Sequence, residues 1–234
     1  DIPSLYSKIM KYKYILFDAD NTLYDFDKSE SEALSLTMEG YGIKITPEQN
    51  SVYHEINDRL WKMLERGEVS RAELKTRRFA EFLEFLGAEP ADTPENVANS
   101  YVGNLALQTY PVEGAEDVCR TLSEKYPLYL ITNGLSFVQR SRISRSPLSK
   151  YFTEVFISEE MGCSKPDLSF FTQVAEAVGD SDARDYIVVG DSLSSDIQGA
   201  VNFGSDSVWI NRTGANDPRP TYTVTDLTDI LGIL

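Results

Sequence analysis

The chain has 234 residues, of which 41% are hydrophobic, and a formal net charge of -15 at neutral pH. This length allows one catalytic domain with an insertion to bury a sizeable core. The acidic balance argues against a nucleic-acid polymer as ligand, because polymer binding draws on clustered lysine and arginine. It does not exclude a single nucleotide, whose charge a metal ion and a few local cations can offset.

The sequence contains no sign of a membrane protein or of a disulfide scaffold. No apolar stretch approaches the roughly 20 residues that span a bilayer, and the first residues lack the apolar core of a secretory signal. The two cysteines, Cys119 and Cys163, are not at a metal-binding spacing and imply no disulfide framework. We therefore expect a soluble cytoplasmic protein with no membrane partner, while its oligomeric state stays open.

The first predicted strand is the apolar run at residues 14–17, and it leads directly into Asp18 and Asp20. Because side chains alternate along a strand, the two carboxylates share one side if the extension persists. Two anions held together need a cation, proton donors or water, and Mg²⁺ supplies the cation. One carboxylate is then placed to attack phosphorus, and the other to pass a proton to or from the leaving oxygen. The alternative is a pair of solvated loop aspartates.

Helical periodicity follows over residues 28–108. Thr46 and Ser70 begin capping boxes, and Thr93 is a cap followed by proline. We predict four helices inserted after the first predicted strand, and a helical insertion at this point can close over a bound phosphate and exclude water. The lone histidine, His54, lies in polar helical sequence and is expected at the surface. Six apolar side chains at helical spacing are expected to pack inside the insertion: Trp61, Leu64, Phe79, Phe82, Leu83 and Phe85.

A second buried strand is predicted at residues 128–132. It ends in Thr132 and Asn133, a hydroxyl and an amide fit for holding phosphate oxygens, although an ordinary Asn-Gly turn is the alternative. Further along, Lys165 precedes Pro166, and proline suits the first position of a helix. We therefore expect the ammonium beside a helix amino terminus, where anions are favoured, with a solvated loop lysine as the alternative.

A third motif follows the apolar strand at residues 186–190. Asp191 and Asp196 come directly after it, and a helix cap would account for only one of these two aspartates. Further strands at residues 154–157 and 207–210 alternate with helical sequence, and residues 226–234 are expected to form a closing helix. The pattern predicts a doubly wound α/β fold with a mostly parallel sheet, whose ligands bind at the carboxyl ends of the strands.

Together the motifs resemble the haloacid dehalogenase-like (HAD) hydrolase superfamily, with its ordered DxD, strand-terminal Ser or Thr, Lys, and GDxxxxD-type segments. The resemblance implies a Rossmann-like catalytic core of residues 1–25 and 109–234, with a helical cap at residues 26–108. It also implies that Asp18 is the nucleophile that forms an aspartyl-phosphate, and that Asp20 is the general acid and later the base. Asp18, Asp191 and the backbone carbonyl of Asp20 would bind Mg²⁺.

The same resemblance implies supporting roles for the other motif residues. Thr132 would bind the phosphoryl group, with Asn133 assigned to phosphate binding beside it. Lys165 would neutralise charge on the nucleophile and the phosphate, and Asp196 would orient Lys165 or support the metal through water. Asp20 favours a phosphatase over a dehalogenase, because a halide leaves without a proton whereas an alkoxide needs one.

A narrower resemblance is carried by residues 17–26, 77–79, 131–134 with Gln139 and Arg142, and 157–160 leading to Lys165. These stretches resemble the YjjG/YfnB group of pyrimidine 5'-nucleotidases. The resemblance implies hydrolysis of nucleoside monophosphates such as UMP, dUMP or dTMP. A sugar-phosphate or phosphoglycolate phosphatase is the close alternative, and a non-catalytic protein that binds a phosphorylated metabolite is a further one. Three arginines, Arg77, Arg78 and Arg142, are either substrate contacts or ordinary solvated or paired residues.

Overall fold

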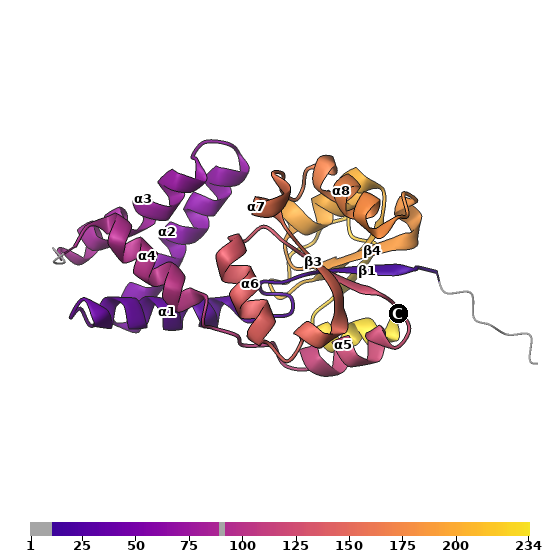
Figure 1. Ribbon diagram of the computed structural model, residues 1–234, viewed down its shortest axis with the longest axis horizontal. Coiled ribbons are helices and arrows are strands. Elements are labelled where there is room, and N and C mark those ends of the chain that lie inside the picture. Colours follow the sequence, from indigo (N-terminus) through magenta and orange to yellow (C-terminus); the bar gives the residue numbers. More distant parts are fainter. Residues whose placement is uncertain (1–10, 89–91) are drawn as a thin grey trace, which may run out of the picture. The chain divides into compact units, whose positions relative to one another are not determined.

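The computed structural model describes residues 11–88 and 92–234, and the chain divides into two compact units (Figure 1). Unit 1 consists of Asp1–Asp25 and Pro111–Leu234, and unit 2 is the intervening segment Phe26–Tyr110. The sequence prediction placed the two boundaries after residues 25 and 108. Residues 1–10 of the predicted catalytic core lie outside the part of the chain that the structure describes.

Unit 1 is built on a parallel sheet, and within the described residues the order of its six strands is β3-β2-β1-β4-β5-β6. β2 and β4 are buried along their whole length, as expected for strands covered on both faces. The order reverses beside β1, which pairs with both of them, so the predicted doubly wound fold is confirmed. The strands are β1 Tyr14–Asp18, β2 Leu128–Thr132, β3 Phe152–Ile157, β4 Tyr186–Gly190, β5 Asp206–Ile210 and β6 Tyr222–Val224.

Strand ends and the last strand are where the sequence prediction differs from the structure. β3 begins two residues before the predicted start at residue 154, and β5 begins one residue before residue 207. β6 was not predicted, because three residues without a buried side chain give no periodic signal. The predicted closing helix is the short 3₁₀ helix η4, Leu227–Gly232.

Each face of the sheet carries its own hydrophobic core. Ile15 and Phe17 belong to one core with α5, Ala115–Ser123, and Leu16 belongs to the other with α8, Leu168–Val178. α5 and α8 accordingly lie on opposite sides of the sheet in Figure 1. The other short elements of unit 1 are α6 Ser136–Arg145, η1 Ser149–Tyr151, α7 Ser158–Met161, η2 Ala183–Asp185, η3 Leu193–Ile197 and α9 Gln198–Phe203.

Unit 2 is helical throughout its regular structure. In its described residues the helices are α1 Phe26–Gly40, α2 Pro47–Glu65, α3 Arg71–Leu86 and α4 Pro94–Leu105. The predicted capping boxes at Thr46 and Ser70 are confirmed, and Thr93 caps the helix that begins at the next residue.

The aromatic core of unit 2 lies between α2, α3 and α4. Phe79 and Phe82 are buried as predicted, and each packs against Tyr53. The prediction was wrong for Phe85, whose side chain is 53% exposed because it lies beyond the buried face of α3. His54 is exposed as predicted, although its Nδ1 lies 2.6 Å from the buried carboxylate of Glu30.

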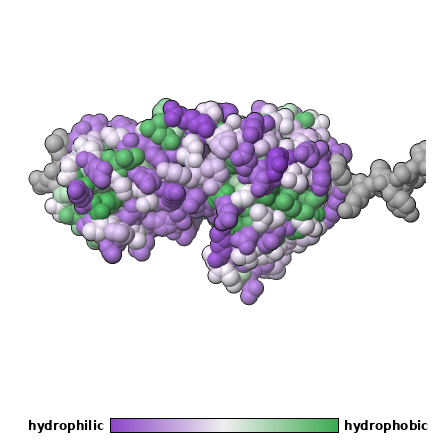
Figure 2. Space-filling view, turned by 90° about the horizontal axis from the view of Figure 1, so that it is seen from below, coloured by the Kyte–Doolittle hydropathy of each residue, from purple (hydrophilic) through white to green (hydrophobic). Residues whose placement is uncertain are grey.

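The visible surface is mainly hydrophilic. On the face shown in Figure 2, hydrophobic residues are interspersed among hydrophilic ones, in keeping with the acidic composition. None of the helices in the described ranges combines the length and apolar character that crossing a bilayer requires.

Candidate active site

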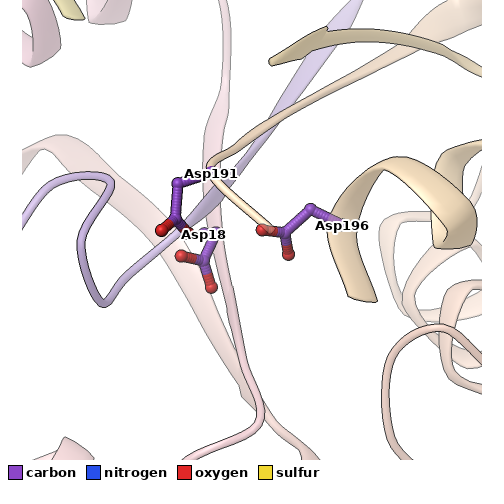
Figure 3. A group of neighbouring side chains, drawn as sticks. All are labelled: Asp18, Asp191 and Asp196. Atoms are coloured by element: carbon purple, nitrogen blue, oxygen red, sulfur yellow. The ribbon is translucent and has the colours of Figure 1, made fainter. Parts of the chain in front are cut away.

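Three strand ends bring predicted site residues together at the carboxyl edge of the sheet in unit 1. β1 ends at Asp18, β2 ends at Thr132, and Asp191 directly follows β4. These are the strands beside which the strand order reverses, the usual position of a ligand site in doubly wound folds. In Figure 3 the carboxylates of Asp18, Asp191 and Asp196 are turned toward a common space.

Lys165 is the cation of this site, and its side chain is 1% exposed. Its Nζ donates to Asp18 Oδ1 at 2.6 Å, to Asp196 Oδ1 at 2.7 Å and to the Ile131 carbonyl at 3.2 Å. Burial alone would lower the pKa of Lys165, but the charges of Asp18 and Asp196 outweigh it and raise the pKa. The ammonium therefore stays charged.

The predicted helix start at Pro166 is wrong. α8 begins at Leu168, with Asp167 as its N-cap, and Pro166 follows Lys165 through a cis peptide bond. The Lys165 ammonium is held by two carboxylates and a backbone carbonyl, and sequence periodicity alone does not reveal these partners.

Asp18, Asp191 and Asp196 form an acidic cluster whose candidate ligand oxygens lie within 4.8 Å of one another. Burial is the main cause that raises the pKa of Asp18 well above its usual range and that of Asp191 to about 7, and the charge of Asp196 adds to both shifts. Lys165 opposes these shifts without cancelling them. Three carboxylates share the Lys165 ammonium, and the charge of Arg212 also acts on Asp191, yet negative charge prevails in the cluster.

This donor set fits a hard divalent cation such as Mg²⁺, which prefers oxygen ligands and few carboxylates. Both oxygens of Asp196 already have partners, since Oδ1 accepts from Lys165 and Oδ2 accepts from the Ser192 backbone N–H at 3.1 Å. Asp18 and Asp191 are therefore the carboxylates best placed to supply metal ligands. Of the two tasks considered for Asp196, the structure shows the contact with Lys165.

The turn after β4 is shaped around Asp196. A Cβ atom on Gly190 would overlap the Asp196 carboxylate, so only glycine allows this close approach. Asp196 itself lies in the π-helical turn η3, and the Trp209 Nε1–H donates to the Asp191 carbonyl at 2.8 Å. Trp209 was not among the predicted site residues, because nothing in its sequence position indicates this contact from β5 to the residue that follows β4.

Thr132 and Asn133 have different partners. Thr132 Oγ1 accepts hydrogen bonds from the Gly134 N–H at 3.2 Å and from Gln139 Nε2 at 2.8 Å. The Asn133 side chain bonds the Lys165 backbone twice, donating from Nδ2 to the carbonyl at 2.8 Å and accepting from the N–H at 2.9 Å. The Asn133 amide thus holds the Lys165 segment in place, and its assignment to phosphate binding stays a prediction.

Asp20 lies outside the acidic cluster, and the extension on which a shared side for Asp18 and Asp20 depends does not persist beyond Asp18. The strand ends at Asp18, and Asn21 adopts a left-handed conformation with φ 60°, which asparagine tolerates well. Asp20 Oδ1 instead pairs with Arg142 Nη1 at 2.6 Å, and Oδ2 accepts from Gln139 Nε2 at 2.6 Å.

The three arginines named as possible substrate contacts differ in their surroundings. Arg142 is buried against Asp20, whereas Arg77 forms an exposed i,i+4 ion pair with Glu81 in unit 2. Arg78 is buried in unit 2, where its Nη1 donates to Asn57 at 3.0 Å. Arg78 and Arg142 are thus buried and Arg77 is exposed, while substrate contact by any of the three stays a prediction.

The site thus combines a buried aspartate that is hydrogen-bonded to a lysine with an acidic cluster at the carboxyl edge of a doubly wound sheet, an arrangement suited to a hydrolase. The chain belongs to the haloacid dehalogenase-like hydrolases, since the model of that family matches residues 12–204.

Similar proteins extend over almost the whole chain. The pyrimidine 5'-nucleotidase PynA of Streptococcus pneumoniae is 35% identical over 229 residues, covering 96% of each chain. The pyrimidine 5'-nucleotidase YjjG of Escherichia coli is 32% identical over 228 residues, covering 96% of this chain and 99% of YjjG. The magnesium-bound structure of the putative HAD-hydrolase YfnB from Bacillus subtilis is 33% identical, covers 96% of this chain and 99% of its own, and superposes with a TM-score of 0.90.

Proposed function

We propose that this protein is a Mg²⁺-dependent phosphomonoesterase that hydrolyses pyrimidine nucleoside 5'-monophosphates through an aspartyl-phosphate on Asp18. The observation that carries the proposal is that the site contains two carboxylates with different partners: Asp18 pairs with Lys165, and Asp20 pairs with Arg142. A haloacid dehalogenase needs only the first, because halide departs unprotonated. An ester oxygen requires a proton, which the second carboxyl group can deliver.

In the first half-reaction, an oxygen of Asp18 forms a bond to phosphorus while the bond from phosphorus to the ester oxygen breaks. Asp20, protonated at this stage, gives its proton to the departing oxygen, so the nucleoside leaves as an alcohol. Lys165 lies 2.6 Å from Asp18 Oδ1 and balances the negative charge that gathers as the phosphoryl group approaches. Thr132 donates its hydroxyl hydrogen to a phosphoryl oxygen.

In the second half-reaction, Asp20 acts as a base. It removes a proton from a water molecule as the water oxygen attacks phosphorus, and the bond from phosphorus to Asp18 breaks. Inorganic phosphate leaves, Asp18 is again a carboxylate, and Asp20 is again protonated for the next turnover. In this scheme Asp20 is the residue that gives up a proton and takes one back in each turnover.

The acidic cluster supports the assignment of a metal. Asp18, Asp191 and the backbone carbonyl of Asp20 would hold Mg²⁺, which would supply the positive charge that three carboxylates and one ammonium lack. We assign residues 26–110, the helical unit 2, as the cap of the enzyme, which would exclude water and contact the leaving group.

The substrate class rests on the relatives. Two proteins that align with nearly the entire chain are named pyrimidine 5'-nucleotidases, which supports a pyrimidine nucleoside monophosphate as substrate. A single nucleotide is compatible with the net charge of -15, since its phosphate is met by Lys165 and the metal rather than by a basic surface.

Phosphate release from a panel of compounds tests the proposal. Wild type and Asp18→Asn are assayed on nucleoside monophosphates, sugar phosphates and phosphoglycolate, each with Mg²⁺ and with EDTA. We expect release only from wild type with Mg²⁺, and fastest from pyrimidine nucleotides. Fastest release from sugar phosphates would keep the chemistry and overturn the substrate. Near-wild-type turnover by Asp18→Asn would overturn the nucleophile, and no turnover of any compound would favour a protein that only binds a phosphorylated metabolite.

A further inference from the structure

One buried face of α6 presents two polar side chains to the site. Gln139 and Arg142, three residues apart on the helix, are each 1% exposed. Arginine and glutamine are rarely buried without partners, because their lost hydration must be replaced. Their partners here are Asp20 and Thr132.

The Gln139 amide uses both of its ends. Its Nε2 lies 2.6 Å from Asp20 Oδ2 and 2.8 Å from Thr132 Oγ1, one contact for each amide hydrogen. Its Oε1 accepts from Arg142 Nη1 at 3.3 Å. Gly134 leaves room for this side chain, because a Cβ atom at that position would overlap the Gln139 amide.

We propose that Gln139 and Arg142 are positioning residues that fix the Asp20 carboxyl group and the Thr132 hydroxyl in their reactive orientations. This inference rests on the function proposed above, in which Asp20 transfers protons and Thr132 binds the phosphoryl group.

The argument for Thr132 follows from its lone pairs. A hydroxyl has one hydrogen to donate and two lone pairs that accept. The Gly134 N–H and the Gln139 amide occupy the two accepting positions at 3.2 Å and 2.8 Å. The hydroxyl hydrogen is then directed away from both donors, and Thr132 is set as a donor to a phosphoryl oxygen.

The argument for Asp20 follows from its two oxygens. Arg142 holds Oδ1 and Gln139 holds Oδ2, so the carboxyl group cannot rotate without breaking a contact. Each carboxylate oxygen keeps a second lone pair, so a proton can be taken up and given away while both contacts persist. Arg142 is itself fixed by burial, with its guanidinium 5.5 Å from the Tyr24 ring.

The two residues can be compared, because Arg142 hydrogen-bonds one oxygen of Asp20, whereas Gln139 hydrogen-bonds the other oxygen and Thr132 as well. We would measure kcat/KM for p-nitrophenyl phosphate, whose leaving group departs without a proton, and for the alkyl phosphate that wild type hydrolyses fastest. The value of kcat/KM reports steps up to the first irreversible one and therefore includes leaving-group departure. Inorganic phosphate is measured as an inhibitor of each variant.

For Arg142→Lys we expect kcat/KM on the alkyl ester to fall by about tenfold or more, and on p-nitrophenyl phosphate by less than about threefold. Gln139→Leu should show the same difference between esters and should also weaken phosphate inhibition by about fivefold, since one donor to Thr132 is lost. The control Arg140→Lys changes an exposed arginine of the same helix that pairs with Glu160, and should match wild type in both measurements.

Equal losses on the two esters, or unchanged phosphate inhibition in Gln139→Leu, would overturn the positioning role while leaving the proposed function standing. A wild type without phosphatase activity would overturn both. If Arg142→Lys does not fold, the ester comparison in Gln139→Leu decides, because Gln139 holds the other oxygen of Asp20.

Discussion

Lys165 and Asp196 form an ion pair in which Nζ lies 2.7 Å from Oδ1 and both side chains are 1% exposed. Placing two charges out of water is costly, so such a pair persists only when each charge is well satisfied. Lys165 also serves Asp18, and one cation therefore stabilises two buried carboxylates. The site depends on this single ammonium more than on any one of its anions.

Replacing that ammonium should destabilise the fold. For Lys165→Met we expect a loss of about 3–5 kcal/mol in the free energy of unfolding at neutral to alkaline pH, because buried carboxylates lose their counter-charge. The loss should shrink in acid, where Asp18, whose pKa burial raises, takes up a proton. Urea unfolding measures both values. Lys150→Met, which removes a lysine that is 61% exposed and paired with Glu116, should leave the stability close to that of wild type.

Metal binding should stabilise the protein in a pH-dependent way. The pKa of Asp191 rises from 3.8 to about 7 in the folded metal-free protein, through burial and the charge of Asp196. Its contribution to stability is therefore present below pH 3.8 and lost as the pH rises through about 7. Mg²⁺ would take the place of the proton, so it should raise Tm by about 2–4 °C at alkaline pH and by much less in mild acid.

Asp191→Asn provides the control for that measurement. It removes a buried charge that lacks a full counter-charge, so the metal-free variant should be more stable than wild type at alkaline pH. The same variant should lose the Mg²⁺-dependent rise in Tm. A rise of equal size at both pH values, or one that survives in Asp191→Asn, would contradict the assignment of this carboxylate to the metal.

The contact between His54 and Glu30 should make unit 2 sensitive to alkaline pH. Its hydrogen bond to the buried carboxylate raises the pKa of His54 from 6.5 to about 9. This stabilisation is complete below pH 6.5 and is lost as the pH rises through about 9. Because His54 is half exposed and screened by solvent, we expect His54→Gln to cost only about 0.5–1 kcal/mol in mild acid and nothing at strongly alkaline pH. Denaturant unfolding across this pH range would show a constant difference if the contact were unimportant.

Gly190→Ala should be destabilising for a reason of space. The new methyl group would overlap the Asp196 carboxylate, which Lys165 and the Ser192 N–H hold in place, so the site must shift. We expect a loss of about 2 kcal/mol or more in unfolding free energy. Gly103→Ala is a matched substitution in α4 with nothing near the added atom, and it should stabilise by up to about 1 kcal/mol. A neutral Gly190→Ala would contradict the close approach.

The sequence predicts most of the fold because its signals are local. Buried strands are continuous apolar runs, and capping residues such as Thr46 and Ser70 mark helix starts within a few positions. β6 escapes prediction because three partly covered residues have no period of their own. The start of α8 was misplaced because proline fits a turn before a helix as well as a first helical position.

The sequence predicts those site residues that belong to short motifs of characteristic residue types. Asp18, Lys165 and Asp191 stand out by residue type and position after strands, and the structure brings them together. The task of Asn133 does not follow from its sequence, because an amide can bond a phosphate or a backbone equally well. The contacts of Gln139 and Arg142 with Asp20 join residues about 120 positions apart, and no local pattern encodes such a distance.

In unit 1, the segment that precedes the insertion lies beside the segment that follows it. Tyr24 and Pro111 form an antiparallel bridge, and the Val112 N–H donates to the Leu23 carbonyl at 2.9 Å. Within unit 2 the ammonium of Lys28 lies 4.3 Å from the ring centre of Tyr110, so the two ends of the insertion are neighbours as well. A folded segment with adjacent ends closes the chain at little more entropic cost than a tight turn would. Unit 2 is thus inserted between two adjacent, antiparallel backbone segments of unit 1. A short loop in its place would join the same two segments and leave the register of the parallel sheet unchanged.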